Sequence, residues 1–318
     1  MSSLRLPSRW IIVSGTIRSG TTFAGNILSI PRDVSYLHEP FNGGTDTREG
    51  LPFESKYVSQ IHNDFDVSAY HTHLENIFRL ELTLPTTSHP NDSSLRTLVK
   101  QTMGSRGPIA LKWAKVNPFS RVGLIKDPTC PLTVEYLYRA FNVLPVIIVR
   151  HPASLAASLK RVEWWPEMTD FTDRPQVIQD HFSDEPDFFE HVWSSPLLES
   201  MAHWRATYKV LLRQAKAYDD WIFLTHEELS QNPIQTFKRL YQRLGLRWGA
   251  LPNYTINRLT SSSNTAEARN NQAMALSRDS KTIFKHRLQS LSKIERKMIY
   301  NIVKDISHNF YHPSTFSV

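Results

Sequence analysis

Short apolar runs alternate along this chain with longer segments in which apolar residues recur every three or four positions. The short runs are rich in valine and isoleucine, which is typical of strands buried on both faces of a parallel sheet. The recurring positions are typical of helices that cover such a sheet. The pattern predicts an α/β protein in which a central, mainly parallel sheet is flanked by helices. No repeat or low-complexity linker divides residues 1–318, so we expect a single domain.

Six apolar runs are predicted to be strands, and five periodic segments are predicted to be helices. The predicted strands are Trp10–Ser14, Tyr36–His38, Pro108–Trp113, Val122–Ile125, Leu144–Val149 and Trp221–Leu224. The predicted helices are Thr22–Ser29, Pro131–Phe141, Ala153–Arg161, Pro196–Ala217 and the segment from Pro233 to Leu244, with Asn232 as its N-cap. Trp204 falls on the apolar stripe of its helix, which predicts core packing rather than contact with a ligand.

Three further segments are described by composition more than by periodicity. Residues 278–318 form a basic C-terminal segment that is predicted to be helical. Residues 42–66 and 163–195 show no clear period, so we expect loops or excursions from the core. The apolar positions predicted to share one face of the C-terminal helix are Leu291, Ile294, Met298, Ile302 and Ile306.

Charge is distributed unevenly along the chain. Residues 163–190 hold nine acids and one base, for a local net charge of −8, whereas the remainder, with 36 bases and 21 acids, carries +15. A basic body is compatible with an anionic ligand or with a solvated basic surface, and the sequence leaves both open. No RNP, zinc-finger or basic-zipper pattern is present, so we do not expect nucleic acid binding.

Composition also bounds the class of protein and its compartment. With 40% hydrophobic and 21% charged residues, the chain is neither disordered nor fibrous. No run approaches the roughly 18 apolar residues of a membrane span, and the first ten residues lack the apolar core of a signal peptide. The single cysteine, Cys130, cannot form an internal disulfide. We therefore expect a cytoplasmic protein.

A glycine-rich turn, Gly15-Thr-Ile-Arg-Ser-Gly-Thr-Thr22, follows the first predicted strand and opens the first helix. Its glycines have the spacing of the phosphate-binding G-x-x-x-x-G-K-[ST] loop, but Thr21 replaces the lysine. A helix N-terminus and a glycine backbone can still cradle an anion, and Arg18 restores a positive charge. A transferred group of lower charge than a γ-phosphoryl group would need the lysine and a metal less, so no metal is expected. The alternative is an ordinary turn with an incidental arginine.

A second motif begins where the Leu144–Val149 strand ends. Arg150-His-Pro-Ala-Ser-Leu-Ala-Ala-Ser158 places an arginine at the carboxyl end of a central strand, where open α/β sheets bind ligands. Ser158 lies about two helical turns further along and can present a hydroxyl to the same anion. A structural salt bridge at Arg150 is the alternative.

Together the two motifs resemble those of the sulfotransferases that use 3′-phosphoadenosine 5′-phosphosulfate (PAPS), over roughly residues 9–245. The likeness is closer to carbohydrate-type and bacterial members than to the animal cytosolic group, whose C-terminal R-K-G-x-x-G-x-W-K signature is replaced here by a loose substitute at residues 277–281. The resemblance implies a P-loop NTPase-like sulfotransferase fold and PAPS as sulfuryl donor. It implies donor contacts from two groups of residues, Arg18, Ser19, Gly20, Thr21 and Thr22 at the 5′-phosphosulfate, and Arg150 and Ser158 at the 3′-phosphate.

Other shared segments are His38-Glu39-Pro40-Phe41, Lys126-Asp127-Pro128 and Thr225-His-Glu-Glu-Leu229. We interpret Glu39, one residue after a predicted strand, as the general base, and Arg18 and Lys126 as stabilising the leaving group. Alternatively, Glu39 pairs with Arg18 or Lys126 and only organises the site. In an extended segment His38 would face away from Glu39. Two other candidates for the base, or for a metal site, are His71 and His73.

The acceptor is expected to carry a hydroxyl, less favourably an amine. Because residues 163–190 follow the second motif directly, their negative charge predicts a neutral, amphipathic or cationic acceptor rather than a polyanion. Trp164 and Trp165 could supply an apolar floor or simply pack. Two other functions remain open at this point, a P-loop kinase or other nucleotide-dependent phosphotransferase, and a basic binding protein without catalysis.

Overall fold

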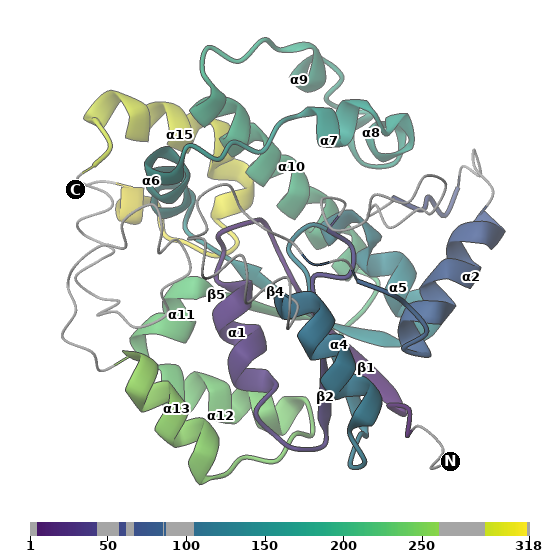
Figure 1. The fold of residues 1–318 in the computed structure, drawn as a ribbon. Coiled ribbons are helices and arrows are strands. Elements are labelled where there is room, and N and C mark those ends of the chain that lie inside the picture. The colour runs from purple at the N-terminus through teal and green to yellow at the C-terminus, as the bar shows by residue number, and fades with distance from the viewer. Residues whose placement is uncertain are drawn as a thin grey trace.

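The computed structural model contains a five-stranded parallel sheet with helices on both faces (Figure 1). Residues 5–42, 57–61, 67–84, 86, 105–260 and 290–316 are described. The strands are β1 (Arg9–Ser14), β2 (Val34–His38), β3 (Val122–Lys126), β4 (Val143–Val149) and β5 (Ile222–Thr225), in the spatial order β2-β3-β1-β4-β5. The predicted fold class is confirmed.

The helices and a short 3-10 turn fill the segments between strands. They are α1 (Thr21–Leu28), α2 (Val67–Phe78), α4 (Arg106–Val116), η2 (Pro131–Thr133), α5 (Val134–Phe141), α6 (Pro152–Val162), α7 (Thr169–Thr172), α8 (Pro175–Phe182), α9 (Asp187–Glu190), α10 (Pro196–Ala215), α11 (His226–Gln231), α12 (Pro233–Arg243), α13 (Ala250–Thr260), α15 (Lys293–Ser307) and η4 (Pro313–Phe316). Within the described residues, no helix is both long and apolar enough to cross a membrane.

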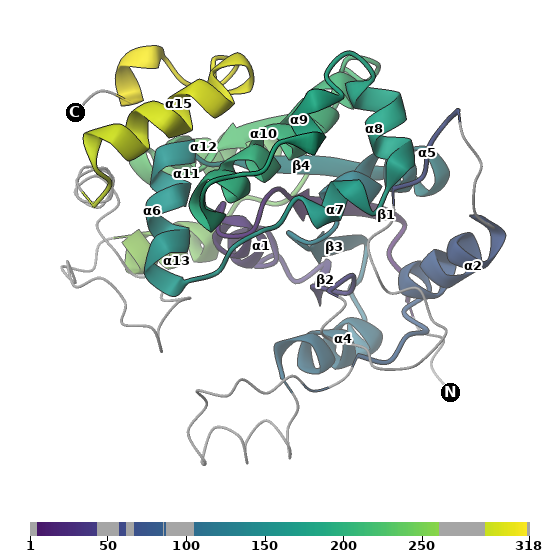
Figure 2. The same ribbon diagram turned by 90° about the horizontal axis from the view of Figure 1, so that it is seen from above.

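Alternate residues of the central strand β1 supply both faces of the sheet. Ile11 and Val13 pack with α1, α12 and α13, whereas Trp10 and Ile12 pack with α2 and α5. On the β4 side, α6, α10 and α15 form a further layer, which Figure 2 shows in the view from above. Trp204 of α10 is fully buried in this layer, as predicted. Because all five strands are parallel, their carboxyl ends share one edge and their amino ends share the opposite edge.

The segment Pro108–Trp113 is not a strand; the prediction was wrong. It lies in α4, which buries Leu111 and Ala114 and packs beside β2. Leu111 and Ala114 are three residues apart, as helical packing requires, whereas Trp113 is exposed. A short apolar run cannot by itself distinguish a strand from one buried side of a helix.

The predicted apolar face of the C-terminal helix is right only in part, because Leu291 and Ile306 are buried and Ile302 packs against the core. α15 buries Ile299, Val303 and Ile306, whereas Ile294 and Met298 are exposed. Ile299 and Val303 follow Met298 and Ile302 by one residue, and Ile306 is common to both faces, so the buried face is turned by less than the roughly 100° between successive residues. Apolar residues line both stripes, and packing against α6 and α10 selects between them.

Three other predictions need a correction or a limit. The 163–195 segment is not a plain loop, since α7, α8 and α9 lie within it. Asn232 occupies the N-cap position of α12 but makes no side-chain cap. Most of residues 42–66, and all of residues 277–281, lie outside the described residues.

Gly123 of β3 offers a test of the sheet packing. Its partner across the ladder is Trp10, and a Cβ at Gly123 would lie only 2.2 Å from the indole ring. We expect Gly123→Ala to lower the free energy of unfolding by about 1–3 kcal/mol, since the core has no room for the methyl group. Gly249→Ala is the matched control, because nothing lies within 4 Å of that Cβ position. Urea unfolding measures both, and equal stability of the two variants would contradict this packing.

Candidate active site

The turn after β1 has the backbone geometry of an anion cradle. Gly15 and Gly20 have φ values of 144° and 103°, and a Cβ would lie 2.3 Å from the Ile148 carbonyl oxygen or 2.5 Å from the His226 ring, respectively. Gly20 is the N-cap of α1 and supplies no side-chain cap to the first turn. Uncapped amides at a helix N-terminus favour an anion. The turn therefore requires glycine at both positions and directs α1 at the site.

The two predicted motifs meet at the carboxyl edge of the sheet. Arg150 Nη1 donates to the carbonyl oxygen of Arg18 at 2.7 Å, although the residues are 132 positions apart. Arg18 Nε in turn donates to Ser158 Oγ at 3.4 Å. Arg18 has a φ of 63°, and this left-handed conformation aims its carbonyl at Arg150. The two motifs are far apart in the sequence but in contact in the fold, because they follow the neighbouring strands β1 and β4. Of the other predicted loop residues, Ser19 and Thr21 are buried, and Gly20 and Thr22 are half-buried.

Arg150 is buried, with 3% of its surface exposed. Its Nε and Nη2 donate to Ser154 Oγ at 3.3 and 3.2 Å, one turn into α6. Burial lowers the pKa of Arg150 to about 10; neighbouring Arg18 adds to this shift, and Glu227 opposes it. Ser154 and Glu227 were missed by sequence reasoning. The available signals were the four-residue spacing from Arg150 to Ser154 and the position of Glu227 just after β5.

Glu227 is held beside Arg150 by the C-terminal part of the chain. Tyr311 donates its hydroxyl to Glu227 Oε2 at 2.7 Å and also contacts the Val149 carbonyl at 3.3 Å. Burial raises the pKa of Glu227, while the hydrogen bond from Tyr311 and the charge of Arg150 act in the opposite direction. The two buried groups therefore stabilise each other's charged forms.

The turn after β2 brings Glu39 against the end of β3. Lys126 Nζ donates to Glu39 Oε1, and Asn42 Nδ2 donates to Oε2 at 3.2 Å. Burial raises the pKa of Glu39 and the Lys126 ammonium lowers it, and the net shift is downward. The sequence left two roles open for Glu39, and the ion pair with Lys126 that the second role requires is present.

His38 lies beside Glu39, contrary to expectation. Glu39 has a φ of 52°, so the strand alternation is broken and both side chains turn to the same side. His38 Nε2 is 3.9 Å from Glu39 Oε1, and its Nδ1 shares a 2.8 Å hydrogen bond with the Tyr36 hydroxyl. Burial, followed by the charge of Lys126, lowers the pKa of His38 to about 4, so the ring is neutral at pH 7.

Asp127 fixes the turn that carries Glu39. Its carboxylate accepts a hydrogen bond from the Phe41 amide at 2.7 Å and from the Thr129 amide and hydroxyl at 2.9 and 2.7 Å. Burial raises the pKa of Asp127 to about 6, against these hydrogen bonds. The turn that follows β2 is thereby hydrogen-bonded to the turn that follows β3.

A charged residue lies at the end of each of the five strands or within four residues after it. In spatial order across the sheet these are Glu39, Lys126, Arg18, Arg150 and Glu227. Three bases therefore follow the three central strands, and a carboxylate follows each outer strand. The centre of the edge can attract an anion, and the β2 side places a carboxylate next to it.

His71 and His73 belong to a different place, the helix α2. His71 Nδ1 contacts the Tyr136 hydroxyl at 2.9 Å, and its ring stacks on Phe141 at 4.6 Å. His73 is buried on the same helix. The described parts of the chain contain no group of three or more His, Cys, Asp or Glu side chains arranged to hold a metal.

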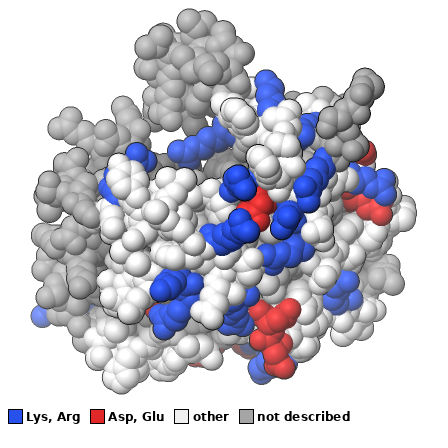
Figure 3. All heavy atoms as spheres, turned by 90° about the horizontal axis from the view of Figure 1, so that it is seen from below, with Lys and Arg blue, Asp and Glu red and all other residues white. Residues whose placement is uncertain are grey.

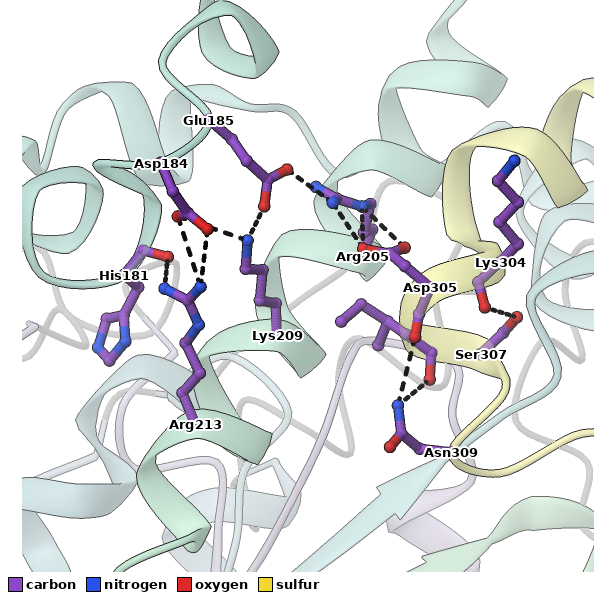
Figure 4. Close-up of polar contacts among 11 residues, drawn as sticks. His181, Asp184, Glu185, Arg205, Lys209, Arg213, Lys304, Asp305, Ser307 and Asn309 are labelled. Atoms are coloured by element: carbon purple, nitrogen blue, oxygen red, sulfur yellow. Dashed lines mark hydrogen bonds and ion pairs between the residues drawn. The ribbon is translucent and has the colours of Figure 1, made fainter.

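The acidic segment is held against α10 by ion pairs (Figure 4). Arg205, Lys209 and Arg213 lie four residues apart on one side of α10 and contact two adjacent acids, Asp184 and Glu185. Arg213 Nη2 is 3.2 Å from Asp184, and Arg205 Nη2 is 2.6 Å from Glu185. The charge of −8 counted in the sequence is thus partly compensated by α10.

Two further contacts anchor the same region. Arg205 also binds Asp305 of α15 at 2.6 Å, and Asp180 accepts hydrogen bonds from Tyr57 and Ser59, both at 2.6 Å. Trp165 packs against the α6, α10 and α15 layer, whereas Trp164 is 52% exposed. Of the two tryptophans, Trp164 has the surface available for contact with an acceptor.

Comparison with known proteins places the chain in a class. The model of the sulfotransferase family matches residues 11–250, so the chain belongs to this family. No curated protein matches the sequence.

Three solved structures of sulfotransferases are similar to this chain. A mouse sulfotransferase complexed with PAP shares 12% identity over 98% of this chain and 89% of its own, with a TM-score of 0.45. A sulfotransferase domain from the curacin biosynthetic pathway shares 14% identity over 95% and 98%, with a TM-score of 0.43. The Mycobacterium avium sulfotransferase STF9 shares 14% identity over 91% and 78%, with a TM-score of 0.42.

His151, beside Arg150, gives a pH-dependent prediction. Its buried ring contacts Thr315 Oγ1 at 3.0 Å and lies 4.3 Å from the Phe316 ring, and burial, with the charge of Arg150, lowers its pKa to about 3. Because the pKa of His151 is lower in the folded protein than in the unfolded chain, where it is about 6.5, the neutral ring favours the folded state above pH 6.5. This contribution to the free energy of unfolding is lost as the pH falls from about 6.5 toward 3. We expect His151→Gln to reduce the pH dependence of the unfolding free energy between pH 6.5 and 4, by up to about 1.4 kcal/mol per pH unit. Urea unfolding across this range measures the slope, and an unchanged slope would contradict the assignment.

Proposed function

We propose that this protein transfers a sulfuryl group from PAPS to a hydroxyl group, less favourably an amine, of an acceptor molecule. Membership of the sulfotransferase family supports sulfuryl transfer. One observation carries the choice of donor, the contact of Arg150 with Arg18 and of Arg18 with Ser158. This contact joins two anion-binding motifs at one edge of the sheet, as a donor with phosphate at both its 3′ and 5′ positions requires.

In this proposal the glycine turn and Arg18 bind the 5′-phosphosulfate. The backbone of the turn supports it, because a Cβ at Gly15 would meet the Ile148 carbonyl oxygen, and one at Gly20 the His226 ring, so only glycine allows this conformation. Arg150 and Ser158 bind the 3′-phosphate, and Ser154 orients the guanidinium through its two hydrogen bonds. Residues 277–281, considered from the sequence as a further donor contact, lie outside the described residues.

The transferred group passes from one oxygen to another. The acceptor oxygen forms a bond to sulfur, the bond from sulfur to the bridging oxygen breaks, and adenosine 3′,5′-bisphosphate leaves with the negative charge. Arg18 and the turn amides stabilise that charge. The acceptor proton goes to Glu39.

Lys126 acts through Glu39 in this scheme. The sequence suggested that Lys126 stabilises the leaving group, but its ammonium donates to Glu39 and is almost fully buried. The ion pair keeps Glu39 ionised and fixes its direction. A lowered pKa makes Glu39 a weak proton acceptor, which suffices when the transition state is loose and the proton leaves late.

The acceptor is proposed to be neutral or amphipathic. Ion pairs to α10 leave Asp187 and Glu190 among the exposed acids of the segment, which still disfavour a polyanion. Trp164, just past the end of α6, offers an exposed indole face near the helix that carries Ser158. The location proposed is cytoplasmic.

Donor binding is tested by thermal shift with a chelator present. Adenosine 3′,5′-bisphosphate at about 100 times its dissociation constant should stabilise the fold by roughly 2.7 kcal/mol without metal. Arg150→Ala should abolish most of this effect, and Arg150→Lys, which keeps the charge but loses the fork, should retain part of it. Arg258→Ala, an exposed arginine of α13, is the control and should behave as the parent protein. In a separate sample without the chelator, equal stabilisation by ATP with magnesium would instead favour the kinase alternative.

The role of Glu39 is tested by Glu39→Gln, which keeps size but removes the proton acceptor. Release of adenosine bisphosphate from PAPS in the presence of a panel of neutral alcohols should slow by about two to four powers of ten. Binding of adenosine bisphosphate should be retained, which separates a lost base from a lost site. His71→Gln serves as the control, because its ring packs with Tyr136 and Phe141. A mild Glu39→Gln phenotype with an inactive His71→Gln would assign the base to the histidine.

A further inference from the structure

The amino ends of the five strands form a second surface, on the edge of the sheet opposite the candidate active site. Arg9 begins β1, Arg32 precedes β2 by two residues, and Arg121 precedes β3 directly. Arg243, at the end of α12, donates to the carbonyl oxygens of Asp220 and Trp221 at the start of β5. We call this surface the amino-edge face.

Hydrogen bonds hold these arginines together as one surface. Ser8 donates to the Arg121 carbonyl through both its amide and its hydroxyl, and the Arg121 amide donates to the Asp33 carbonyl at 2.9 Å. Arg9 Nη2 donates to the Gly245 carbonyl at 3.1 Å, just beyond α12. With strands about 4.8 Å apart, the face is roughly 20 Å wide.

The charge of the amino-edge face is positive. Figure 3, the view from below, shows lysine and arginine side chains gathered over this side with few acids among them. No described carboxylate lies within ion-pair distance of Arg9, Arg32, Arg121 or Arg243, in contrast to the bases of α10. The acids at these strand starts, Asp33, Asp219 and Asp220, are fewer than the bases. The face therefore attracts an extended anionic partner.

Large exposed apolar side chains lie near these arginines, by contact or along the chain. Phe119 is 49% exposed, and the Arg32 guanidinium lies 4.7 Å from its ring centre. Val116 ends α4 and is exposed, and the next residue, Asn117, donates to the Arg32 carbonyl at 3.1 Å. Leu6, two residues before Ser8, is exposed as well. Trp113, one turn before Val116 on α4, is also exposed.

We propose that the amino-edge face docks onto an anionic lipid surface. Arginines spread over a broad face would contact the headgroups, and Leu6, Val116 and Phe119 would enter the boundary between headgroups and acyl chains. Tryptophan favours that depth, which suits Trp113. A nucleic acid would satisfy the arginines but would leave the three apolar side chains exposed to water. The active-site edge, on the opposite side of the sheet, stays open to donor and acceptor.

The experiment is co-sedimentation of the full chain with phosphatidylcholine vesicles, with and without roughly 30% phosphatidylserine. Binding is expected only with phosphatidylserine and should weaken at high salt, because exposed charges are screened. Arg32→Gln combined with Arg121→Gln should lower the partition coefficient by about tenfold or more. Val116→Ser combined with Phe119→Ser should also lower it severalfold, since apolar burial is lost.

Matched controls come from α15, which packs on α6 and α10 in another layer. Lys297→Gln with Lys304→Gln removes two exposed charges, and Ile294→Ser removes an exposed apolar side chain. Both controls should bind vesicles as the parent does, and all variants should keep the thermal midpoint of the parent. Equal loss in the control variants, or no binding to phosphatidylserine vesicles, would overturn the proposal. A third result would also overturn it. In that case the chain binds a DNA duplex through these arginines, and Val116→Ser with Phe119→Ser does not change binding to vesicles. None of these outcomes depends on the identity of the sulfuryl donor.

Discussion

The hydrogen bond from Arg150 to the carbonyl of Arg18 joins the two halves of the candidate active site. It requires a left-handed Arg18, a buried guanidinium and the direct pairing of β1 with β4. Tyr208 of α10 links the same two strands. Its hydroxyl accepts a hydrogen bond from the Thr16 amide at 3.2 Å and donates one to the Ile148 carbonyl at 2.7 Å. A buried arginine needs such surroundings, since its charge cannot be left without polar partners. The layer of α6, α10 and α15 therefore serves the site by excluding water from around Arg150.

The opposite side of the site depends on a different device. Asp127 ties the turn after β2 to the turn after β3, and the positive φ of Glu39 then directs its carboxylate at Lys126. A non-glycine residue in this conformation costs free energy, which the surrounding structure must offset. The hydrogen bonds of Asp127 and the Lys126 ion pair are the interactions that offset it here. The Glu39 carboxylate is thereby fixed in direction at the carboxyl edge of the sheet.

The sequence predicted what local pattern and strand order determine. Glycine spacing located the turn before α1, and the Arg150 motif was placed at a strand end, so their meeting followed once both strands were assigned to one parallel sheet. What it could not predict depends on tertiary contacts. The side of α15 that is buried is decided by the helices that it contacts. The segment Pro108–Trp113 is too short for its period to be recognised. His38 turns toward Glu39 only because the φ angle of Glu39 departs from the strand value. The roles of individual site residues remain predictions.

The fold also changes the meaning of the net charge. The sequence indicates only that the chain is basic outside residues 163–190, whereas the described bases at the two sheet edges and on α10 fall into three separate groups. Arg18, Lys126 and Arg150 lie at the carboxyl edge, flanked by Glu39 and Glu227. The bases of α10 are engaged by the acidic segment and by Asp305. The arginines at the amino edge, by contrast, have no described acidic partner. Because Coulomb interactions between exposed groups fall off within about 10 Å at ordinary salt, these populations act separately. The two edges therefore differ less in net charge than in setting. The bases of the carboxyl edge lie beside the carboxylates of Glu39 and Glu227, two of them buried, whereas Arg32, Arg121 and Arg243 of the amino edge are exposed.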